Sequence, residues 1–394
     1  MVFLKKLRKL RNVNIHHVCM KELNNPFVIY GYKGADYFCD RVEETQRMIS
    51  ALHNERNITL IAQRRMGKTG LILHAFDKIA KSQPTARCFY IDIFSTKNLG
   101  QMVQLFARTI LSRLDTNTQG AMRKITEFFG SWRPVISFDQ LTGLPSVSLD
   151  IKPTEATKTL KQIFEYMQLS GKRCYVAIDE FQQILNYSDQ GIEAELRSYI
   201  QFLPNVYFVF SGSMQHIMEE MFTSANRPFF QSSQIMHLDS VDRAEYREFA
   251  NRFFRKQHRA ISEECFAHLY NKVDGITWYV QSILNRAYQY DNETIDTTLV
   301  DRLIRELTDE QESVFQSFYA SLTELQALLL QAIAKEECVY SPFAHEFISK
   351  YRLRAVSSVR TALKALTDKQ LVYHKPEGYI VYDRFFGLWL KEKA

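Results

Sequence analysis

The chain has 394 residues, which is long for one hydrophobic core, so two or three domains are expected. Hydrophobic residues make up 46% of the chain and charged residues 24%, a composition typical of soluble globular proteins. No apolar run approaches the roughly 18 to 20 residues that span a bilayer, which argues against a membrane protein. The formal net charge of +6 permits an acidic partner such as nucleic acid but does not require one.

The cysteines favour a reducing compartment. Six of them are scattered along the chain without a C-x-x-C pair, which is typical of reduced, mostly buried thiols in a cytosolic protein. We therefore expect a cytoplasmic location.

The first 23 residues are predicted to form a basic N-terminal extension. Lysine and arginine side chains alternate with apolar residues between positions 5 and 11, but the stretch lacks the apolar core of a secretory signal. It is either a basic amphipathic tail, or Met20 rather than Met1 is the functional start. We expect residues 1–20 to be poorly ordered.

A helix is expected to lead into the first strand. Residues 26–57 contain an amphipathic pattern that follows Asp40, a candidate N-cap, with Glu43 at the capping-box position. Pro26 and Phe27 precede this helix and are candidates for an adenine pocket. The alternative is that this segment serves only to begin the helix and does not contact a nucleotide.

Residues 59–72 are predicted to form a phosphate-binding loop. An apolar strand pattern enters a tight basic turn that carries Gly67, Lys68 and Thr69, and an apolar helical pattern leaves it. In such a P-loop the backbone N–H groups wrap the phosphates, the Lys reaches the β/γ oxygens, and the Thr hydroxyl binds Mg²⁺. Ala62 stands where the spacing G-x-x-x-x-G-K-[ST] has its first Gly, which is tolerable if φ is negative there. The nucleotide-binding residues expected here are Ala62, Gln63, Arg64, Arg65, Met66, Gly67, Lys68, Thr69 and Gly70.

Helices and strands alternate after this loop. The spacing of apolar residues predicts helices over 71–80, 98–115, 121–129 and 154–169, and a buried strand over 88–94. Two period-2 runs with turn residues between them predict a hairpin insertion at about 133–152. The alternation as a whole is typical of a parallel α/β sheet.

A second nucleotide motif ends the apolar run over residues 174–181. Two adjacent carboxylates, Asp179 and Glu180, follow the run, which is the Walker B arrangement. Asp179 is expected to support Mg²⁺ through its water shell, and Glu180 to polarise the attacking water. Because packing alone seldom places two carboxylates at the end of a buried strand, this pair and the P-loop together predict an ATPase.

Two further positions are candidates for contact with the γ-phosphate. The apolar run over 206–213 ends in Ser211 and Ser213, with Gln215 as a weaker candidate, although small polar residues there also cap helices. Arg227 is a candidate arginine finger or sensor, because a guanidinium neutralises charge on the transferred phosphoryl group; the alternative is a surface loop position. The residues assigned to catalysis are Glu180, Lys68, Arg227 and Ser213, and those assigned to the metal are Thr69 and Asp179.

The order of these motifs resembles the archaeal-type P-loop ATPases of the STAND/AAA-related group, from about residue 24 to the C-terminus. The resemblance is carried by Asn25-Pro26-Phe27, Asp40-Arg41, Arg64-Arg65-Met66-Gly67-Lys68-Thr69, Ile178-Asp179-Glu180, Ser211-Gly212-Ser213 and Arg227-Pro228-Phe229. It implies ATP and Mg²⁺ as cofactors. The departures are Ala62, Gly70 where the group often has Ser, and Thr277 where the group has the Pro of a Gly-x-Pro turn that opens a lid helix.

The rest of the chain is predicted to form a lid and an effector domain. Helical patterns fill residues 240–308, and from residue 322 three helices and a β-wing predict a winged helix-turn-helix. In that fold the third helix enters a DNA major groove and the wing touches the backbone. Arg360, Lys364 and Lys375 are the tentative nucleic-acid contacts, and docking of a protein or of the lid is the alternative.

The sequence thus predicts an α/β fold, a P-loop NTPase parallel sheet followed by an all-α lid and a C-terminal winged helix-turn-helix. The expected bounds are 1–23, 24–239, 240–318 and 319–394. The leading hypothesis is an ATP-hydrolysing switch that couples nucleotide state to the winged helix, with double-stranded DNA or a protein effector as partner and nucleotide-dependent self-association. The alternative is a non-catalytic, ATP-gated scaffold whose winged helix binds protein. A small-molecule kinase is a third, distant reading, because such kinases lack the carboxylate pair followed by a sensor strand and lid.

Overall fold

The structure is a computed structural model that describes residues 22–114, 134–138, 145–149, 155–189, 191–290 and 293–393. The basic extension, apart from its last two residues, and the helix expected over 121–129 lie outside these ranges.

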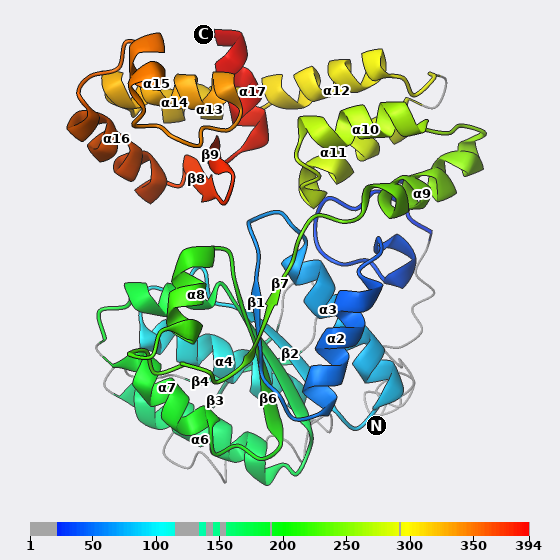
Figure 1. The fold of residues 1–394 in the computed structure, drawn as a ribbon. Coiled ribbons are helices and arrows are strands. Elements are labelled where there is room, and N and C mark those ends of the chain that lie inside the picture. Colours follow the sequence, from blue (N-terminus) through cyan, green and yellow to red (C-terminus); the bar gives the residue numbers. More distant parts are fainter. Residues whose placement is uncertain are drawn as a thin grey trace.

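A five-stranded parallel sheet forms the centre of the first domain (Figure 1). Its strands lie in the order β2-β5-β6-β1-β7, and each neighbouring pair is parallel. Every residue of β1, β5 and β6 is buried, as expected for parallel strands that helices cover on both faces. The predicted parallel α/β sheet is therefore confirmed. The strands are β1 (Ile58–Ile61), β2 (Arg87–Asp92), β5 (Cys174–Asp179), β6 (Val206–Gly212) and β7 (Gln234–His237).

Helices cover the two faces of the sheet unequally. The apolar side chains of α2 (Val42–His53) and α3 (Lys68–Ser82) share one core cluster with the lid and the winged helix. The other cluster takes its side chains from the helices of the opposite face, α4 (Leu99–Leu114), α6 (Ala156–Leu169), α7 (Ile192–Ile200) and α8 (Gln215–Thr223), with the short η3 (Phe181–Asn186). The expected hairpin is present as a separate antiparallel pair, β3 (Pro134–Phe138) with β4 (Pro145–Leu149).

The predicted cap of α2 is wrong. Asp40 and Arg41 both have positive φ, 50° and 64°, and the helix begins at Val42 without a side-chain cap. Arg41 is buried, pairs with Glu44 at 2.8 Å, and donates from Nη2 to the Met66 carbonyl of the P-loop at 3.4 Å. The left-handed backbone at Asp40 and Arg41 thus places the Arg41 guanidinium against a carbonyl of the P-loop.

The remaining helices form two further groups above the carboxyl edge of the sheet (Figure 1). The predicted lid helices are present as α9 (Arg243–Phe254), η4 (Arg255–Gln257), α10 (Glu263–Lys272), α11 (Thr277–Gln289) and α12 (Thr297–Asp309). The winged-helix group comprises α13 (Glu312–Ala320), α14 (Glu324–Glu336), α15 (His345–Lys350), α16 (Val356–Asp368), β8 (Val372–Lys375), β9 (Gly378–Val381) and α17 (Arg384–Lys393).

The wing depends on a glycine where two segments approach closely. Gly378 has φ of 141°, and a Cβ there would lie 2.6 Å from the carbonyl carbon of Val339. Val339 forms an isolated antiparallel bridge with Tyr379, so the wing is anchored to the segment that follows α14. Only a residue without a side chain permits this approach.

Two observations concern the whole described chain. No described helix is long and apolar enough to cross a membrane. The cysteines within the described ranges are free thiols, as predicted.

Candidate nucleotide-binding site

The loop between β1 and α3 has the backbone that a P-loop requires. Gly67 has φ of 94° at the start of α3, a conformation that favours glycine. Arg65 also has a positive φ, 68°, which costs a non-glycine residue roughly 1 to 2 kcal/mol. Ala62 is absent from the described residues with positive φ, so its backbone does not require glycine, which is the condition set for alanine at this position.

Lys68 lies across the loop. Its Nζ donates to the carbonyl oxygens of Ala62 at 3.0 Å and Gln63 at 3.3 Å. Burial lowers the pKa of Lys68, while the carboxylates of Glu180 and Asp179 oppose that shift. The ammonium group is therefore poorly hydrated, and its hydrogen-bond partners among the described residues are neutral carbonyls, so an incoming phosphate oxygen would be a stronger acceptor.

Thr69 and Asp179 come together although 110 residues separate them. Thr69 Oγ1 donates to Asp179 Oδ2 at 3.0 Å. Tyr90, on β2, donates its hydroxyl proton to the same oxygen, and its own oxygen lies 3.3 Å from Thr69 Oγ1. A hydroxyl and a carboxylate in contact are oxygen ligands of the kind Mg²⁺ prefers, so the residues present fit this ion. Sequence reasoning missed Tyr90, because nothing in its own strand distinguishes it from a packing residue.

Glu180 is held by two neighbours. Its Oε2 accepts hydrogen bonds from Ser213 Oγ at 2.7 Å and from Gln182 Nε2. The backbone of Glu180 is left-handed, with φ of 54°. Of the two candidate serines, Ser213 is thus the one in contact with the Walker B carboxylate, whereas Ser211 Oγ is buried without a hydrogen-bond partner among the described residues.

A cavity of about 350 Å³ adjoins the loop. Its walls include residues 28–33, Phe38, the P-loop, both Walker B carboxylates, and Thr277, Trp278 and Gln281 of the lid. Pro26 and Phe27, the predicted adenine contacts, are buried but not among the lining residues. Phe27 is fully buried among the rings of Phe249, Phe253, Phe254 and Tyr288, so it joins the N-terminal segment to the lid helices. Residues 28–33, which follow it, line the cavity.

The lid helix α11 contacts the loop directly, even though Thr277 stands where the resembled group has Pro. Thr277 Oγ1 donates to the Met66 carbonyl at 3.1 Å, and the backbone N–H of Trp278 donates to the Arg65 carbonyl at 3.0 Å. The first turn of the lid helix therefore fixes two peptide groups of the P-loop.

Arg227 lies elsewhere within this chain. Its guanidinium pairs with Glu193 at 3.2 Å and with Glu220 at 3.8 Å, and it is not among the residues that line the cavity at the loop. A sensor role toward the nucleotide of the same chain gains no support from this position. A role as an arginine finger toward a second copy stays a prediction.

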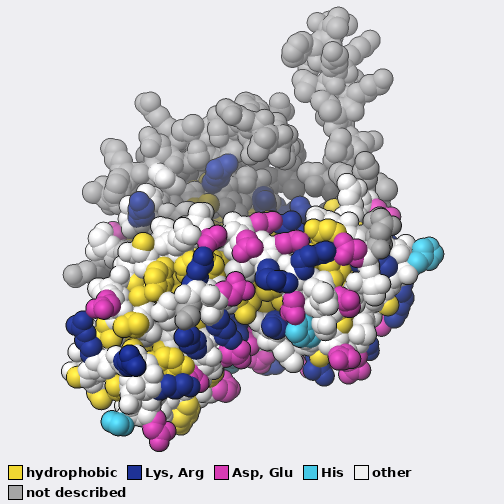
Figure 2. Space-filling view, turned by 90° about the horizontal axis from the view of Figure 1, so that it is seen from above, with side chains coloured by type: hydrophobic (Ala, Val, Ile, Leu, Met, Phe, Trp, Pro, Cys, Tyr) yellow, Lys and Arg dark blue, Asp and Glu magenta, His cyan; other side chains and the backbone are white. Residues whose placement is uncertain are grey.

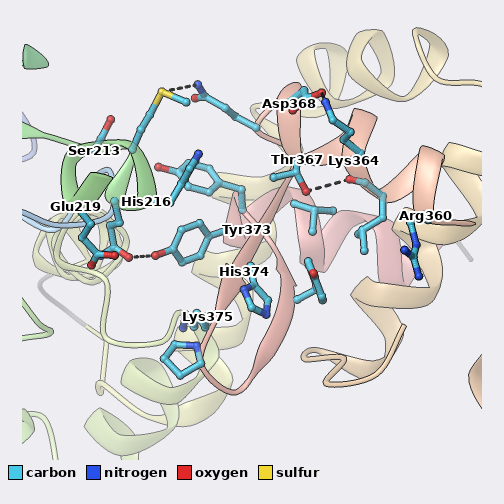
Figure 3. Close-up of a pocket in the computed structure, with 18 of the residues that line it drawn as sticks. Ser213, His216, Glu219, Arg360, Lys364, Thr367, Asp368, Tyr373, His374 and Lys375 are labelled. Carbon is cyan, nitrogen blue, oxygen red and sulfur yellow. Dashed lines mark hydrogen bonds and ion pairs between the residues drawn. The ribbon is translucent and has the colours of Figure 1, made fainter. Parts of the chain in front are cut away.

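The predicted nucleic-acid contacts border a second cavity, of about 660 Å³, between α8 and the winged helix (Figure 3). Lys364 pairs with Asp368 at 2.8 Å, Arg360 lies over the ring of Phe343, and Lys375 pairs with Asp274 of the lid at 3.1 Å. Across the upper face of the molecule, basic and acidic side chains are interspersed (Figure 2). DNA contact by these residues stays a prediction.

Fold and site together define a P-loop NTPase domain that carries a C-terminal winged helix. The family model described as "ATPase domain predominantly from Archaea" matches residues 38–283, more than half of the chain, and the chain belongs to this family. The model described as "Probable winged helix domain" matches residues 313–392.

Solved structures share the fold at low sequence identity. The Walker-type ATPase PABY2304 of Pyrococcus abyssi is 16% identical with a TM-score of 0.63, over 93% of this chain and 99% of its own. The ORC2 protein of Aeropyrum pernix, in ADPNP–ADP complexes, is 16% identical with a TM-score of 0.56, over 90% of this chain and 93% of its own. A comparison with curated proteins finds no match.

Proposed function

We propose that this protein binds ATP at the P-loop and hydrolyses it, using Glu180 to activate water. The observation that carries the proposal is the convergence of the two motifs: Thr69 Oγ1 lies 3.0 Å from Asp179 Oδ2 beside a buried Lys68. The loop amides and Lys68 bind and orient the phosphates, and Thr69 and Asp179 would hold Mg²⁺. The ion, when bound, neutralises charge on the phosphate oxygens. The family membership and the nucleotide complexes of ORC2 support nucleotide binding.

The carboxylate of Glu180 has a defined task in this scheme. It accepts a proton from the attacking water, so one of its oxygens must face that water. Because Ser213 and Gln182 donate to Oε2, the other oxygen is the one available for the water. Ser213 thereby orients the base, which is the form in which we propose its catalytic role.

The second candidate function, an ATP-gated scaffold with little hydrolysis, is favoured by the same contacts. The hydrogen bonds from Ser213 and Gln182 hold the Glu180 carboxylate in place, and a carboxylate held in this way can also serve to position its neighbours without taking a proton. In either function we propose that the winged helix is the effector domain, with double-stranded DNA as its partner and a protein as the alternative.

Hydrolysis separates the two candidates. Glu180→Gln is expected to lower the rate of phosphate release from MgATP by about 100-fold to 10,000-fold while ATP still binds, because the glutamine cannot accept the proton. Glu165→Gln, on α6 and paired with Lys161 at 3.8 Å, is the matched control and should leave the rate unchanged. An unchanged rate in Glu180→Gln would contradict the catalytic assignment of Glu180, and negligible phosphate release from the wild type itself would favour the scaffold.

A further inference from the structure

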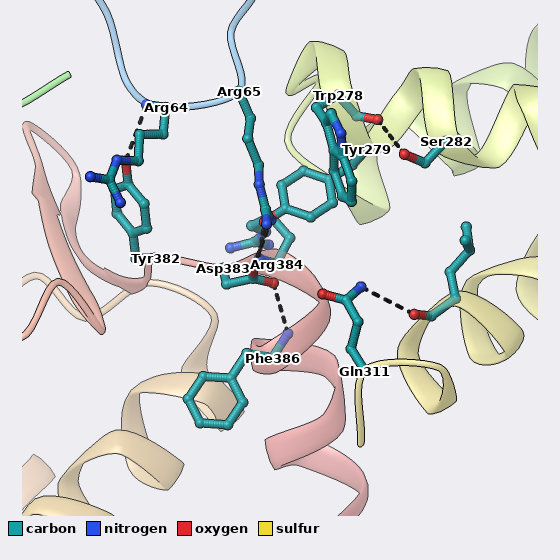
Figure 4. A network of polar contacts seen from close by, with 11 residues as sticks. Arg64, Arg65, Trp278, Tyr279, Ser282, Gln311, Tyr382, Asp383, Arg384 and Phe386 are labelled. Carbon is teal, nitrogen blue, oxygen red and sulfur yellow. Dashed lines mark hydrogen bonds and ion pairs between the residues drawn. The ribbon is translucent and has the colours of Figure 1, made fainter. Parts of the chain in front are cut away.

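The end of the wing lies against the P-loop, although more than three hundred residues separate the two segments. The backbone N–H of Arg64 donates to the hydroxyl oxygen of Tyr382 at 3.1 Å. Arg65 Nη1 donates to Asp383 Oδ2 at 2.6 Å. Figure 4 shows both arginines pointing from the loop toward this segment. Consecutive loop residues are therefore bound by consecutive residues of the winged-helix domain.

The Arg65 side chain joins three parts of the molecule. Its guanidinium lies over the ring of Trp278 at 4.3 Å and of Tyr279 at 4.9 Å, both on lid helix α11. Tyr279 also accepts a hydrogen bond from the backbone N–H of Arg384 at 3.1 Å. The loop, the lid and the wing thus meet at one cation, and the charge of Arg65 is directed to Asp383 rather than into the cavity.

Tyr382 links the two cavities through Arg64, which lines the cavity at the loop and donates its N–H to the Tyr382 hydroxyl. It borders the larger cavity together with Ser213, which itself holds Glu180. Burial raises the pKa of Tyr382 to about 12, the contact with Arg64 opposes that shift, and the charge of Glu180 adds to it. The hydroxyl is therefore neutral near pH 7 and sits within the electrostatic reach of the Walker B carboxylate.

We propose that Tyr382 and Asp383 occupy the groups of Arg64 and Arg65 that would otherwise bind phosphate, and that they thereby compete with the bound nucleotide for these two arginines. The inference rests on the proposed nucleotide binding at the P-loop. One N–H group donates one strong hydrogen bond, so a phosphate oxygen that accepts from Arg64 must displace the phenol. A phosphate also attracts the Arg65 guanidinium away from Asp383.

Reciprocity gives this competition a consequence for the effector domain. If the docked wing weakens nucleotide binding by some factor, bound nucleotide weakens docking of the wing by the same factor. Arg360 and Lys364 are already exposed, so undocking would act on the wing: it would separate Lys375 from Asp274 and open the cavity that these residues border. The winged helix is thereby sensitive to phosphate at the loop without a separate sensor residue.

Two conservative variants test the proposal. Tyr382→Phe removes only the competing hydroxyl, and Asp383→Asn removes the charge but keeps a side-chain oxygen for the Phe386 N–H that Asp383 caps at 3.1 Å. Each is expected to tighten binding of ADP and of a non-hydrolysable ATP analogue by about 3-fold to 10-fold, measured by calorimetry. Tyr379→Phe, in the same wing, and Glu337→Gln, paired with Lys391, are the matched controls and should bind as the wild type does.

A second readout follows the wing itself. Amide hydrogen exchange over residues 372–384 is expected to rise when nucleotide saturates the wild type, and to be raised already in both variants without nucleotide. Unchanged or weaker binding in both variants, with exchange indifferent to nucleotide, would overturn the proposal. If Lys68→Ala loses nucleotide binding in the same experiment, the P-loop is still the nucleotide site even when the competition by Tyr382 and Asp383 is refuted. Failure of this proposal is therefore distinguishable from failure of the proposed function.

Discussion

Tyr90 contacts both residues that we propose as the Mg²⁺ ligands, Thr69 and Asp179. Its hydroxyl donates to Asp179 Oδ2, the oxygen that also accepts from Thr69. Burial and the charge of Asp179 raise the pKa of Tyr90 well above its usual range, so it remains a donor at any physiological pH. Donors of this kind orient a ligating carboxylate and are commonly as important as a direct ligand.

We expect Tyr90→Phe to raise the Mg²⁺ concentration that half-saturates ATP hydrolysis by roughly 10-fold, because Asp179 loses the donor that orients it. Binding of ATP measured without metal should change little. Tyr175→Phe on the neighbouring strand, whose hydroxyl bonds to Gln83 instead, is the control. An Mg²⁺ dependence identical in Tyr90→Phe and wild type would exclude the positioning role.

At the scale of elements, the sequence predicted what is local and missed what distant elements contribute. The P-loop and the Walker B strand were predictable because strand, turn and helix patterns adjoin their own motif residues. Tyr90 and Tyr382 were not, because each reaches the site from an element with no motif of its own. Asp40 failed as a cap because the backbone there is left-handed, which local propensity does not reveal.

The segment before α2 illustrates the same limit of local reasoning. Phe27 was predicted to contact adenine, yet it lies among aromatic rings of α9 and α11 with no exposed surface. Its role is therefore to join the N-terminal segment to the lid helices. Residues 28–33, which follow it, are the part that borders the cavity.

We expect Phe27→Leu to destabilise the protein by about 1 to 2 kcal/mol, seen as a lower denaturation midpoint, because the smaller side chain leaves a gap between rings. The affinity for ATP of the folded variant should remain within about 2-fold of wild type, since the side chain does not reach the cavity. Phe202→Leu, at a 74% exposed position, should alter neither quantity. A lower affinity for ATP with an unchanged denaturation midpoint would instead support the predicted contact between Phe27 and adenine.

At the scale of the whole molecule, the winged helix is docked on the ATPase domain through its wing, while Arg360 and Lys364 of α16 remain exposed. Tyr373 in β8 bonds to Gln215 of α8, and both Lys375 and Arg384 pair with Asp274 in the turn before α11. The wing points toward the sheet domain in Figure 1. A partner can therefore reach Arg360 and Lys364 in this arrangement, whereas a partner that also uses Lys375 requires this lysine to leave Asp274.

We expect the full chain to bind double-stranded DNA more tightly with a non-hydrolysable ATP analogue than without nucleotide. Arg360→Ala with Lys364→Ala should then weaken that binding and reduce the slope of log affinity against log salt by about 2, close to one unit per phosphate contact. Arg354→Ala, an exposed cation of the same domain paired with Glu324, is the control. A slope indifferent to the double substitution would favour a protein partner.

The central claim is that the loop closed by Lys68 and Thr69 binds ATP. Its most direct test is a calorimetric titration of ATP into the wild type and into Lys68→Ala, with Lys78→Ala of the same helix as control. We predict saturable binding at one site in the wild type and the control, weakened at least 10-fold in Lys68→Ala because the buried ammonium no longer meets the phosphates. Equal affinity in wild type and Lys68→Ala would contradict the account.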